Sequence, residues 1–296
     1  MKKAFFQLHV AVFLAGFTGI LGNLITLNEG MLVWYRLLFT SIIMWVLYGL
    51  GKKMQPLPLR SILRISGVGF IMALHWITFY ASIKYANVSV ALVSFSSLGF
   101  FTALFEPLIL RKRINKLELL FGLMTIAGIA VIFHFDTNYK TGIILGLISG
   151  MLAALFPIYN REFLQGMNSE TMLTWQQTGA LVSVSIILPF YLQWFPVEHF
   201  LIGRNDFFWM MFLVIICSVI AFQFSSYALR HLSAFTVNLS FNLEPVYGIL
   251  MAFVVFHENK DLNGGFFLGF AIILLVLLVH VLLLVRSEKR KRLAQM

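Results

Sequence analysis

Ten apolar segments, each about 20 residues long, follow one another through almost the whole chain. A helix of about 20 residues crosses the hydrocarbon core of a bilayer, because each residue adds about 1.5 Å. The segments lack the polar–apolar alternation that a transmembrane barrel requires, so we predict helices. The predicted segments run over residues 4–26, 31–50, 61–83, 86–110, 116–135, 141–163, 171–193, 207–229, 232–256 and 264–286.

The composition places the chain in a membrane. Hydrophobic residues make up 60% of the 296 residues and charged residues 11%, against roughly 45–50% and 25% in soluble domains. A soluble fold of this length could not bury so much apolar surface, so we expect an all-α integral membrane protein. The first segment follows Lys2 and Lys3 without a cleavage site of small residues, which predicts a retained span. The single cysteine, Cys217, excludes a disulfide framework.

The basic residues predict the orientation of the helices. Most of the 22 Lys and Arg residues lie at one set of segment ends, whereas the opposite ends carry only Lys84, Lys140, Arg204 and Lys260. Because positively charged loops stay in the cytoplasm, both termini are predicted to be cytoplasmic, as an even number of spans requires. The net charge of +10 therefore reflects topology. The basic tail, residues 287–296, is expected to face anionic lipid rather than nucleic acid.

The two halves of the chain share an internal repeat. Short matches recur at a nearly constant spacing: Tyr80-Ala81 as Tyr227-Ala228, Ser94-Phe95 as Ser240-Phe241, and Gly122 as Gly269. We therefore predict two repeats of five helices, residues 4–135 and 141–286. Because five is odd, the second repeat would be inverted relative to the first. Many secondary transporters have this architecture, with a substrate site near the midplane between the repeats.

Glycines are arranged for close helix packing in two segments. Gly142, Gly146 and Gly150 follow one another at four-residue steps, and Gly16 and Gly22 lie in the first segment. Small residues on one face let helices approach closely without a hydrophobic driving force. We interpret these glycines as packing residues.

Two stretches resemble the signature regions of one transporter family. YALRHLSAFTVNLSFNLEPVYGILMAFVVFHE (227–258) and HWITFYASIKYANVSVAL (75–92) are similar to the second and first repeats of EamA-type proteins, which belong to the drug/metabolite transporter superfamily. The resemblance implies ten helices in two five-helix repeats and a multi-pass protein of the bacterial inner (plasma) membrane. It also implies export or exchange of small metabolites, often amino acids. The chain departs from the family pattern at Leu98-Gly99, where relatives often carry a proline, and at Lys112-Arg113, where Gly-Glu is usual.

The segment 232–256 contains the first candidate site residues. Glu244 lies near its middle, with Asn238 and Asn242 before it and Pro245 directly after it. An ionised Glu244 could pair with a cationic substrate or carry a coupling proton; alternatively, it hydrogen-bonds a neighbouring helix. The two asparagines, one helical turn apart, could bind substrate or join helices. Pro245 removes a backbone donor and is predicted to kink the helix.

Two further acid–base relationships follow from position. Arg36 lies inside the segment 31–50. It is expected to extend outward toward Glu29; alternatively, it binds a carboxylate in a vestibule. Glu106 lies about one turn before Arg111 and is predicted to pair with that basic end.

Four more residues are candidates for the substrate pathway. His75, Trp76 and Tyr80 lie in the third segment, where Trp76 and Tyr80 share a face, and Gln223 lies in the eighth. Each could line a cavity or serve only in packing or in joining helices. Gln176 begins the seventh segment and is interpreted as an interfacial anchor.

The chain has no phosphate loop, zinc-ligand spacing or nucleophile elbow, so we expect neither an enzyme nor a cofactor. The leading hypothesis is a secondary transporter, an exporter or exchanger of small metabolites, that works by alternating access around a central cavity. Its partners would be a small-molecule substrate and the lipid bilayer. Transport would be coupled to protons or uncoupled, and the protein would be a monomer or a homodimer. The alternative is a non-transporting membrane sensor or assembly partner.

Overall fold

The computed structural model of the chain describes residues 2–135, 137–197, 200–232, 240–241 and 243–294. Its regular elements in these ranges are all helical, which confirms the all-α class. The α-helices are α1 (Lys2–Leu24), α2 (Glu29–Met44), α3 (Leu59–Tyr85), α4 (Val88–Phe95), α5 (Leu98–Ile109), α6 (Lys116–Phe135), α7 (Lys140–Phe163), α8 (Ser169–Trp194), α9 (Arg204–Phe212), α10 (Ala221–His231), α12 (Glu244–Val255) and α13 (Gly264–Ala294). Two π-helices continue them, η1 (Trp45–Leu50) after α2 and η3 (Leu213–Ile220) between α9 and α10; two short 3-10 turns are η2 (Thr137–Tyr139) and η4 (Glu258–Lys260).

Within the described ranges, eight helical stretches are long and apolar enough to cross a membrane. These are α1, α2 with η1, α3, α4 with α5, α6, α7, α9 with η3 into α10, and α13. The two other predicted segments also contain helices. The 26-residue α8 contains the segment 171–193, and the 12-residue α12 lies inside the segment 232–256.

Asparagine side chains start three of the helices. Asn28, Asn87 and Asn168 precede α2, α4 and α8, and each accepts a hydrogen bond, of 2.8, 2.8 and 2.9 Å, from a backbone N–H in the first turn. The first N–H groups of a helix have no intrahelical partner, so such a cap stabilises the start by about 1 kcal/mol. Each cap therefore fixes the residue at which its helix begins.

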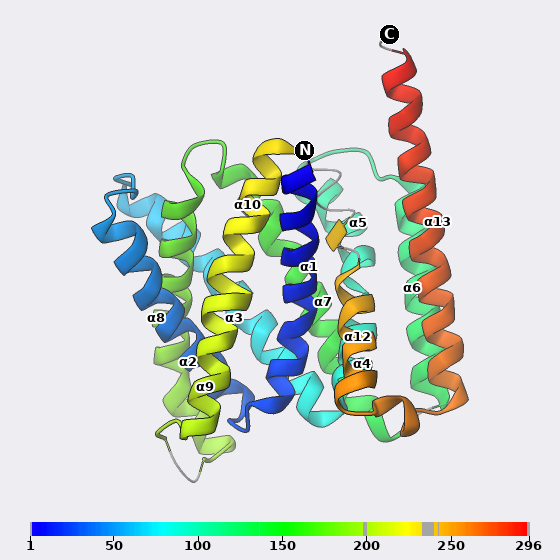
Figure 1. The fold of residues 1–296 in the computed structure, drawn as a ribbon, viewed down its shortest axis with the longest axis horizontal. Helices are drawn as coiled ribbons and strands as arrows, with labels where there is room; N and C mark the ends of the chain where they lie inside the picture. The colour runs from blue at the N-terminus through cyan, green and yellow to red at the C-terminus, as the bar shows by residue number, and fades with distance from the viewer. Residues whose placement is uncertain (1, 136, 198–199, 233–239, 242, 295–296) are drawn as a thin grey trace.

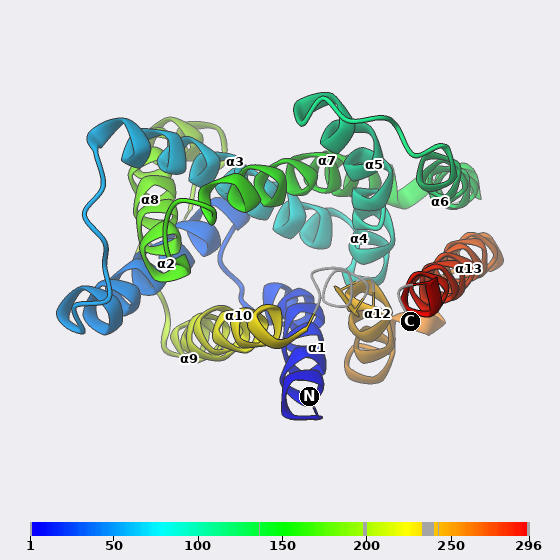
Figure 2. The ribbon, with the colours of Figure 1, turned by 90° about the horizontal axis from the view of Figure 1, so that it is seen from above.

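Seen from above, the helices form two rows (Figure 2). The helices α9, α10, α1 and α12 lie along one side and α3, α7 and α4 along the other, while α2 and α8 lie at one end of the molecule. At the other end α6 and α13 run side by side, and both chain termini lie at the same end of the bundle (Figure 1). The helix α1 packs against α10 and α12, and α7 packs against α3 and α4.

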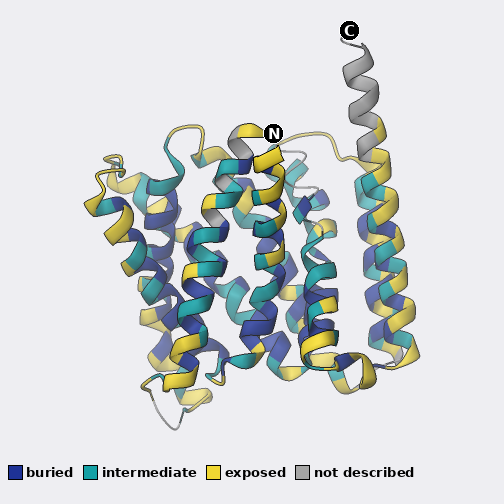
Figure 3. Ribbon diagram, viewed as in Figure 1, coloured by how far each residue is buried: buried dark blue, intermediate teal, exposed yellow. Residues whose placement is uncertain are grey.

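The helices carry exposed residues on their outer faces and buried ones between them (Figure 3), and the exposed residues include many large hydrophobic side chains. Leu63, Ile186, Val254 and Leu278 are examples on four different helices. In water such a surface would be unfavourable, but hydrocarbon tails cover it in a bilayer. The burial pattern is therefore that of a membrane-embedded bundle.

Glycine sets the closest helix contact beside α12. A Cβ on Gly16 would lie 2.8 Å from the carbonyl oxygen of Glu244 and 3.0 Å from the amide nitrogen of Gly248. Both are backbone atoms, so α1 and α12 touch through their main chains. On α7, Gly150 faces Ser97 in the same manner. The prediction that these glycines serve helix packing is confirmed.

Candidate functional site

Arg36 is the centre of a buried group of polar and aromatic contacts inside the bundle. Its side chain is only 5% exposed. Nη1 donates a 2.7 Å hydrogen bond to the hydroxyl of Tyr80, and Nη2 donates one of 3.2 Å to Oγ of Ser218. The guanidinium also stacks on Trp76, with 3.8 Å between its carbon and the ring centroid. We call these four residues the Arg36 cluster.

Three separate elements build the Arg36 cluster. Trp76 and Tyr80 are one helical turn apart on α3 and present one face to α2. Gly22 of α1 makes room for the Tyr80 ring, because a Cβ there would overlap it. Ser218 lies in the π-helix η3, where its hydroxyl donates to the carbonyl of Leu213 five residues earlier. Single π-helical turns are frequent at functional sites.

The prediction that Arg36 extends toward Glu29 is wrong. Glu29 instead accepts a 2.7 Å hydrogen bond from the hydroxyl of Tyr191 on α8. The stack on Trp76 and the two hydroxyl acceptors hold the Arg36 side chain inside the bundle. Sequence position could not reveal this, because the direction of a long side chain depends on neighbours from other helices.

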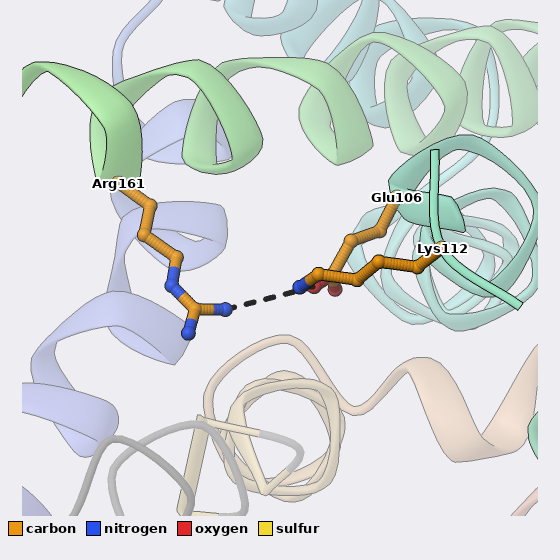
Figure 4. Close-up of polar contacts among 3 residues, drawn as sticks. All are labelled: Glu106, Lys112 and Arg161. Atoms are coloured by element: carbon orange, nitrogen blue, oxygen red, sulfur yellow. Dashed lines mark hydrogen bonds and ion pairs between the residues drawn. The ribbon is translucent and has the colours of Figure 1, made fainter. Parts of the chain in front are cut away.

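The charge of Arg36 is unpaired in the part of the chain that the structure describes. The ion pairs recorded there join Glu106 to Lys112 and Arg161, at 3.3 and 3.6 Å, on the protein surface (Figure 4). The prediction that Glu106 pairs with the basic end that starts at Arg111 is therefore confirmed, with Lys112 as the partner, and Arg161 of α7 is a second partner. No carboxylate oxygen in the described ranges lies within 4 Å of Arg36. Its Nε is buried without a hydrogen-bond partner.

Glu244, the first candidate acid, makes no ion pair with Arg36. It begins α12 and is partly exposed. Pro245 lies in the first turn of α12, where its missing N–H costs nothing. Most of the stretch before α12 lies outside the described residues, so the kink at Pro245 stays a prediction. Asn238 and Asn242 lie outside the described residues.

His75 is separate from the Arg36 cluster, although it precedes Trp76 directly. Its Nδ1 lies 2.8 Å from Oγ of Ser149 on α7, and its ring stacks on Phe95 with 5.4 Å between the centroids. His75 is also buried. These contacts join α3, α4 and α7, which is the helix-joining role that was the alternative for His75.

The remaining candidates do not meet at the cluster. Gln223 on α10 is exposed, and its amide lies 3.4 Å from the hydroxyl of Tyr48. Gln176 is fully buried and exchanges hydrogen bonds with Asn160, so the prediction of an interfacial anchor is wrong. A surface hollow of about 360 Å³ lies away from the cluster, beside Trp45 and Trp175.

Two buried carboxylates were not singled out as site residues by sequence. Glu258 accepts hydrogen bonds of 2.9 and 2.8 Å from the amides of Val88 and Ser89, so it caps α4 from the far end of the chain. Asp206 accepts bonds of 2.9 and 2.7 Å from the amide and hydroxyl of Thr26. Asp206 lies in the first turn of α9 and Glu258 begins η4, both outside the predicted apolar segments, whose pattern carries no information about such contacts.

The described residues hold no cluster of three or more His, Cys, Asp or Glu side chains suited to a metal ion. The Arg36 cluster offers a ligand one cation, two hydroxyls and an aromatic face, which are groups suited to binding.

Comparisons with known proteins agree with this architecture. A solved crystal structure superposes with a TM-score of 0.64, over 97% of this chain and 99% of its own, at 15% identity, which shows a shared fold. A protein of Archaeoglobus fulgidus named as an uncharacterized transporter is 23% identical over 241 residues, 78% of this chain and 80% of that protein. Another uncharacterized transporter, from Haemophilus influenzae, is 22% identical over 166 residues, 53% of this chain and 54% of its own.

The family comparison covers nearly the whole chain. The sequence model of the EamA-like transporter family matches twice, over residues 2–134 and 140–281. Together with the eight membrane-crossing helices of the described ranges, this match settles the class. The chain is a multi-pass membrane protein and belongs to the EamA-like transporter family.

Proposed function

We propose that the protein is a secondary transporter that exports or exchanges small metabolites, such as amino acids, by alternating access. Ten helices would form two inverted repeats, residues 4–135 and 141–286, followed by the basic tail 287–296. The substrate would bind in a central cavity between the repeats. The observation that carries this proposal is the double match to one transporter family, over residues 2–134 and 140–281.

The helix packing supports inverted repeats. In the proposed numbering α1 and α7 are the first helices of the two repeats. The helix α7 packs on α3 and α4, the third and fourth spans of the first repeat, while α1 packs on α10 and α12 of the second. The fifth helices, α6 and α13, pack on each other. Such reciprocal contacts are what a twofold relation between the repeats requires.

We infer that both termini are cytoplasmic in a bacterial inner membrane. The two chain ends lie at the same end of the bundle (Figure 1), as an even number of crossings demands. Lys52, Lys53, Arg111 and Lys112, which lie in connections between helices, would then face the cytoplasm, in accord with the rule that cytoplasmic loops are basic.

Flux through purified protein tests the transport function. Proteoliposomes are preloaded with one member of a panel of amino acids and small organic acids, and exchange against the labelled compound is followed. We expect exchange of at least one compound above that of protein-free liposomes and of liposomes with heat-denatured protein. Absence of flux for the whole panel, with a stable partner protein in pull-downs, would favour the sensor or assembly role.

Glu244 is the candidate for proton coupling. If it carries the proton, Glu244→Gln abolishes flux driven by a pH gradient and leaves substrate exchange intact, because only the driven reaction moves a proton. The exposed Glu162 at the end of α7 offers a matched control, and Glu162→Gln should change neither reaction. A gradient dependence that survives in Glu244→Gln would remove this role.

A further inference from the structure

We propose that the Arg36 cluster is the subsite that holds a single carboxylate group of the transported molecule. The inference rests on the proposed transport function, and it adds the group of the substrate that is recognised and the residues that recognise it. Arg36 would bind the carboxylate, Tyr80 and Ser218 would orient the guanidinium, and Trp76 would cover one of its faces.

The charge balance of the site is the first argument. Arg36 is only 5% exposed, and the groups that accept its hydrogen bonds are neutral hydroxyls. A buried cation is normally paired with an acid, because burial removes the hydration that stabilises its charge. No acid of the described residues forms an ion pair with Arg36. An anionic ligand would supply the missing charge.

The donor geometry is the second argument. A guanidinium has five N–H donors in one plane, and the structure records hydrogen bonds from Nη1 and Nη2 while Nε remains without a partner. Nε and an adjacent Nη form the edge that a carboxylate contacts through two parallel hydrogen bonds. The Trp76 ring, with its centroid 3.8 Å from the guanidinium carbon, stacks on the guanidinium.

The surrounding groups favour one carboxylate over a phosphate. Within the Arg36 cluster the guanidinium is the one positive charge, since Trp76, Tyr80 and Ser218 are neutral. A phosphate dianion would need more positive charge than one guanidinium provides.

The competing interpretation is that Arg36 only joins α2, α3 and η3. A joining role requires no ligand, so ligand binding separates the two interpretations. Cys217 provides a built-in reporter, because it is the one cysteine of the sequence, it precedes Ser218 in η3, and it is buried. Because this thiol is buried, it is alkylated only when the bundle opens around η3, and a ligand on the Arg36 cluster should slow that opening.

The experiment uses the full-length protein in nanodiscs and three probes of similar size: 3-phenylpropanoate, L-phenylalanine and the neutral 3-phenylpropanamide. Thermal unfolding and the rate of Cys217 alkylation by N-ethylmaleimide are measured with each probe. A ligand that binds only the folded protein stabilises it by RT ln(1 + [L]/Kd), so ~10 mM probe gives a detectable rise in melting temperature for Kd values near ~1 mM. We expect a carboxylate probe to raise the melting temperature and slow alkylation, and the amide to do neither.

Variants then assign the effect to Arg36. Arg36→Gln should abolish both effects of the carboxylate, and Arg36→Lys, which keeps a charge but loses the planar fork, should weaken binding about 10-fold. Arg161→Gln is the matched control, since Arg161 is surface-exposed, and it should bind as the unmodified protein does. The subsite would be overturned if the amide and the carboxylate had equal effects, or if no probe had any effect, and these two results need only the unmodified protein. It would also be overturned if Arg36→Gln responded to the carboxylate as the unmodified protein does.

Flux separates this inference from the transport proposal. Carboxylate flux that Arg36→Gln leaves unchanged would overturn the subsite and retain transport. Arg36-dependent binding without flux of any compound would support the subsite and overturn transport.

Discussion

The crossing of α1 and α12 at Gly16 allows a prediction with a magnitude. In Gly16→Ala the new Cβ would lie 2.8 Å from the Glu244 carbonyl oxygen and 3.0 Å from the Gly248 nitrogen, although ordinary van der Waals contact begins near 3.4 Å. Both partners are backbone atoms that cannot rotate away. The two helices must therefore separate by several tenths of an ångström along their contact.

The energetic cost follows from two opposing terms. Overpacking of a tight interior contact costs about 1–3 kcal/mol. Replacement of glycine by alanine within a helix returns up to about 1 kcal/mol, because alanine loses less backbone entropy. Gly16→Ala should therefore destabilise the protein by about 1–2 kcal/mol, which corresponds to a melting temperature lower by roughly 3–6 °C.

The assay is thermal unfolding of detergent-solubilised protein, followed by fluorescence-detected size exclusion. Gly67→Ala on α3 is the matched control, because a Cβ there meets no heavy atom within 4 Å. It should leave the melting temperature unchanged or raise it slightly. If Gly16→Ala melted at the same temperature as Gly67→Ala, the inference that main-chain contact sets this crossing would be refuted.

Three further predictions concern buried and exposed carboxylates. Glu258→Gln should lower stability by about 1–3 kcal/mol, because an amide cannot accept all the hydrogen bonds that cap α4; a melting temperature equal to that of Glu162→Gln would contradict this. Asp206→Asn should accelerate amide hydrogen exchange at Thr26, whose N–H it holds at 2.9 Å, and unaltered exchange would show that the contact is dispensable. Glu106→Gln should change the free energy of unfolding by less than about 1 kcal/mol, because the partners of Glu106 are exposed. A fall in melting temperature that corresponds to a larger loss of stability would contradict a surface role.

The helical architecture could be predicted from the sequence because hydrocarbon imposes a length and a composition on each span. Length and apolarity alone define eight of these helices in the described ranges. Short-range rules add some helix starts, as at Asn87, whose side chain accepts from a nearby amide. The break at Pro245 was harder to place, since a proline in an apolar run fits a kink or a first turn equally well.

The candidate site was predicted only in part. Helical periodicity correctly placed Trp76 and Tyr80 on one face. It could not show that Arg36 meets them, because their partners come from helices distant in sequence: Tyr80 is 44 residues and Ser218 is 182 residues away from Arg36. Ser218 was missed because one serine in an apolar run carries no signal of its own. The choice of partner is set by tertiary packing, which a pattern within one segment does not contain.

The cap that Glu258 places on α4 has a consequence for synthesis and insertion. The amide of Val88 donates a hydrogen bond to Glu258, and Val88 leaves the ribosome 170 residues before Glu258 does. At about 5–20 residues per second, the start of α4 would wait on the order of 10–30 s for its carboxylate. During that interval water, lipid head groups or the insertion machinery must accept the hydrogen bonds of those amides. The first half of the chain thus reaches its final hydrogen bonding only when the second half is nearly complete.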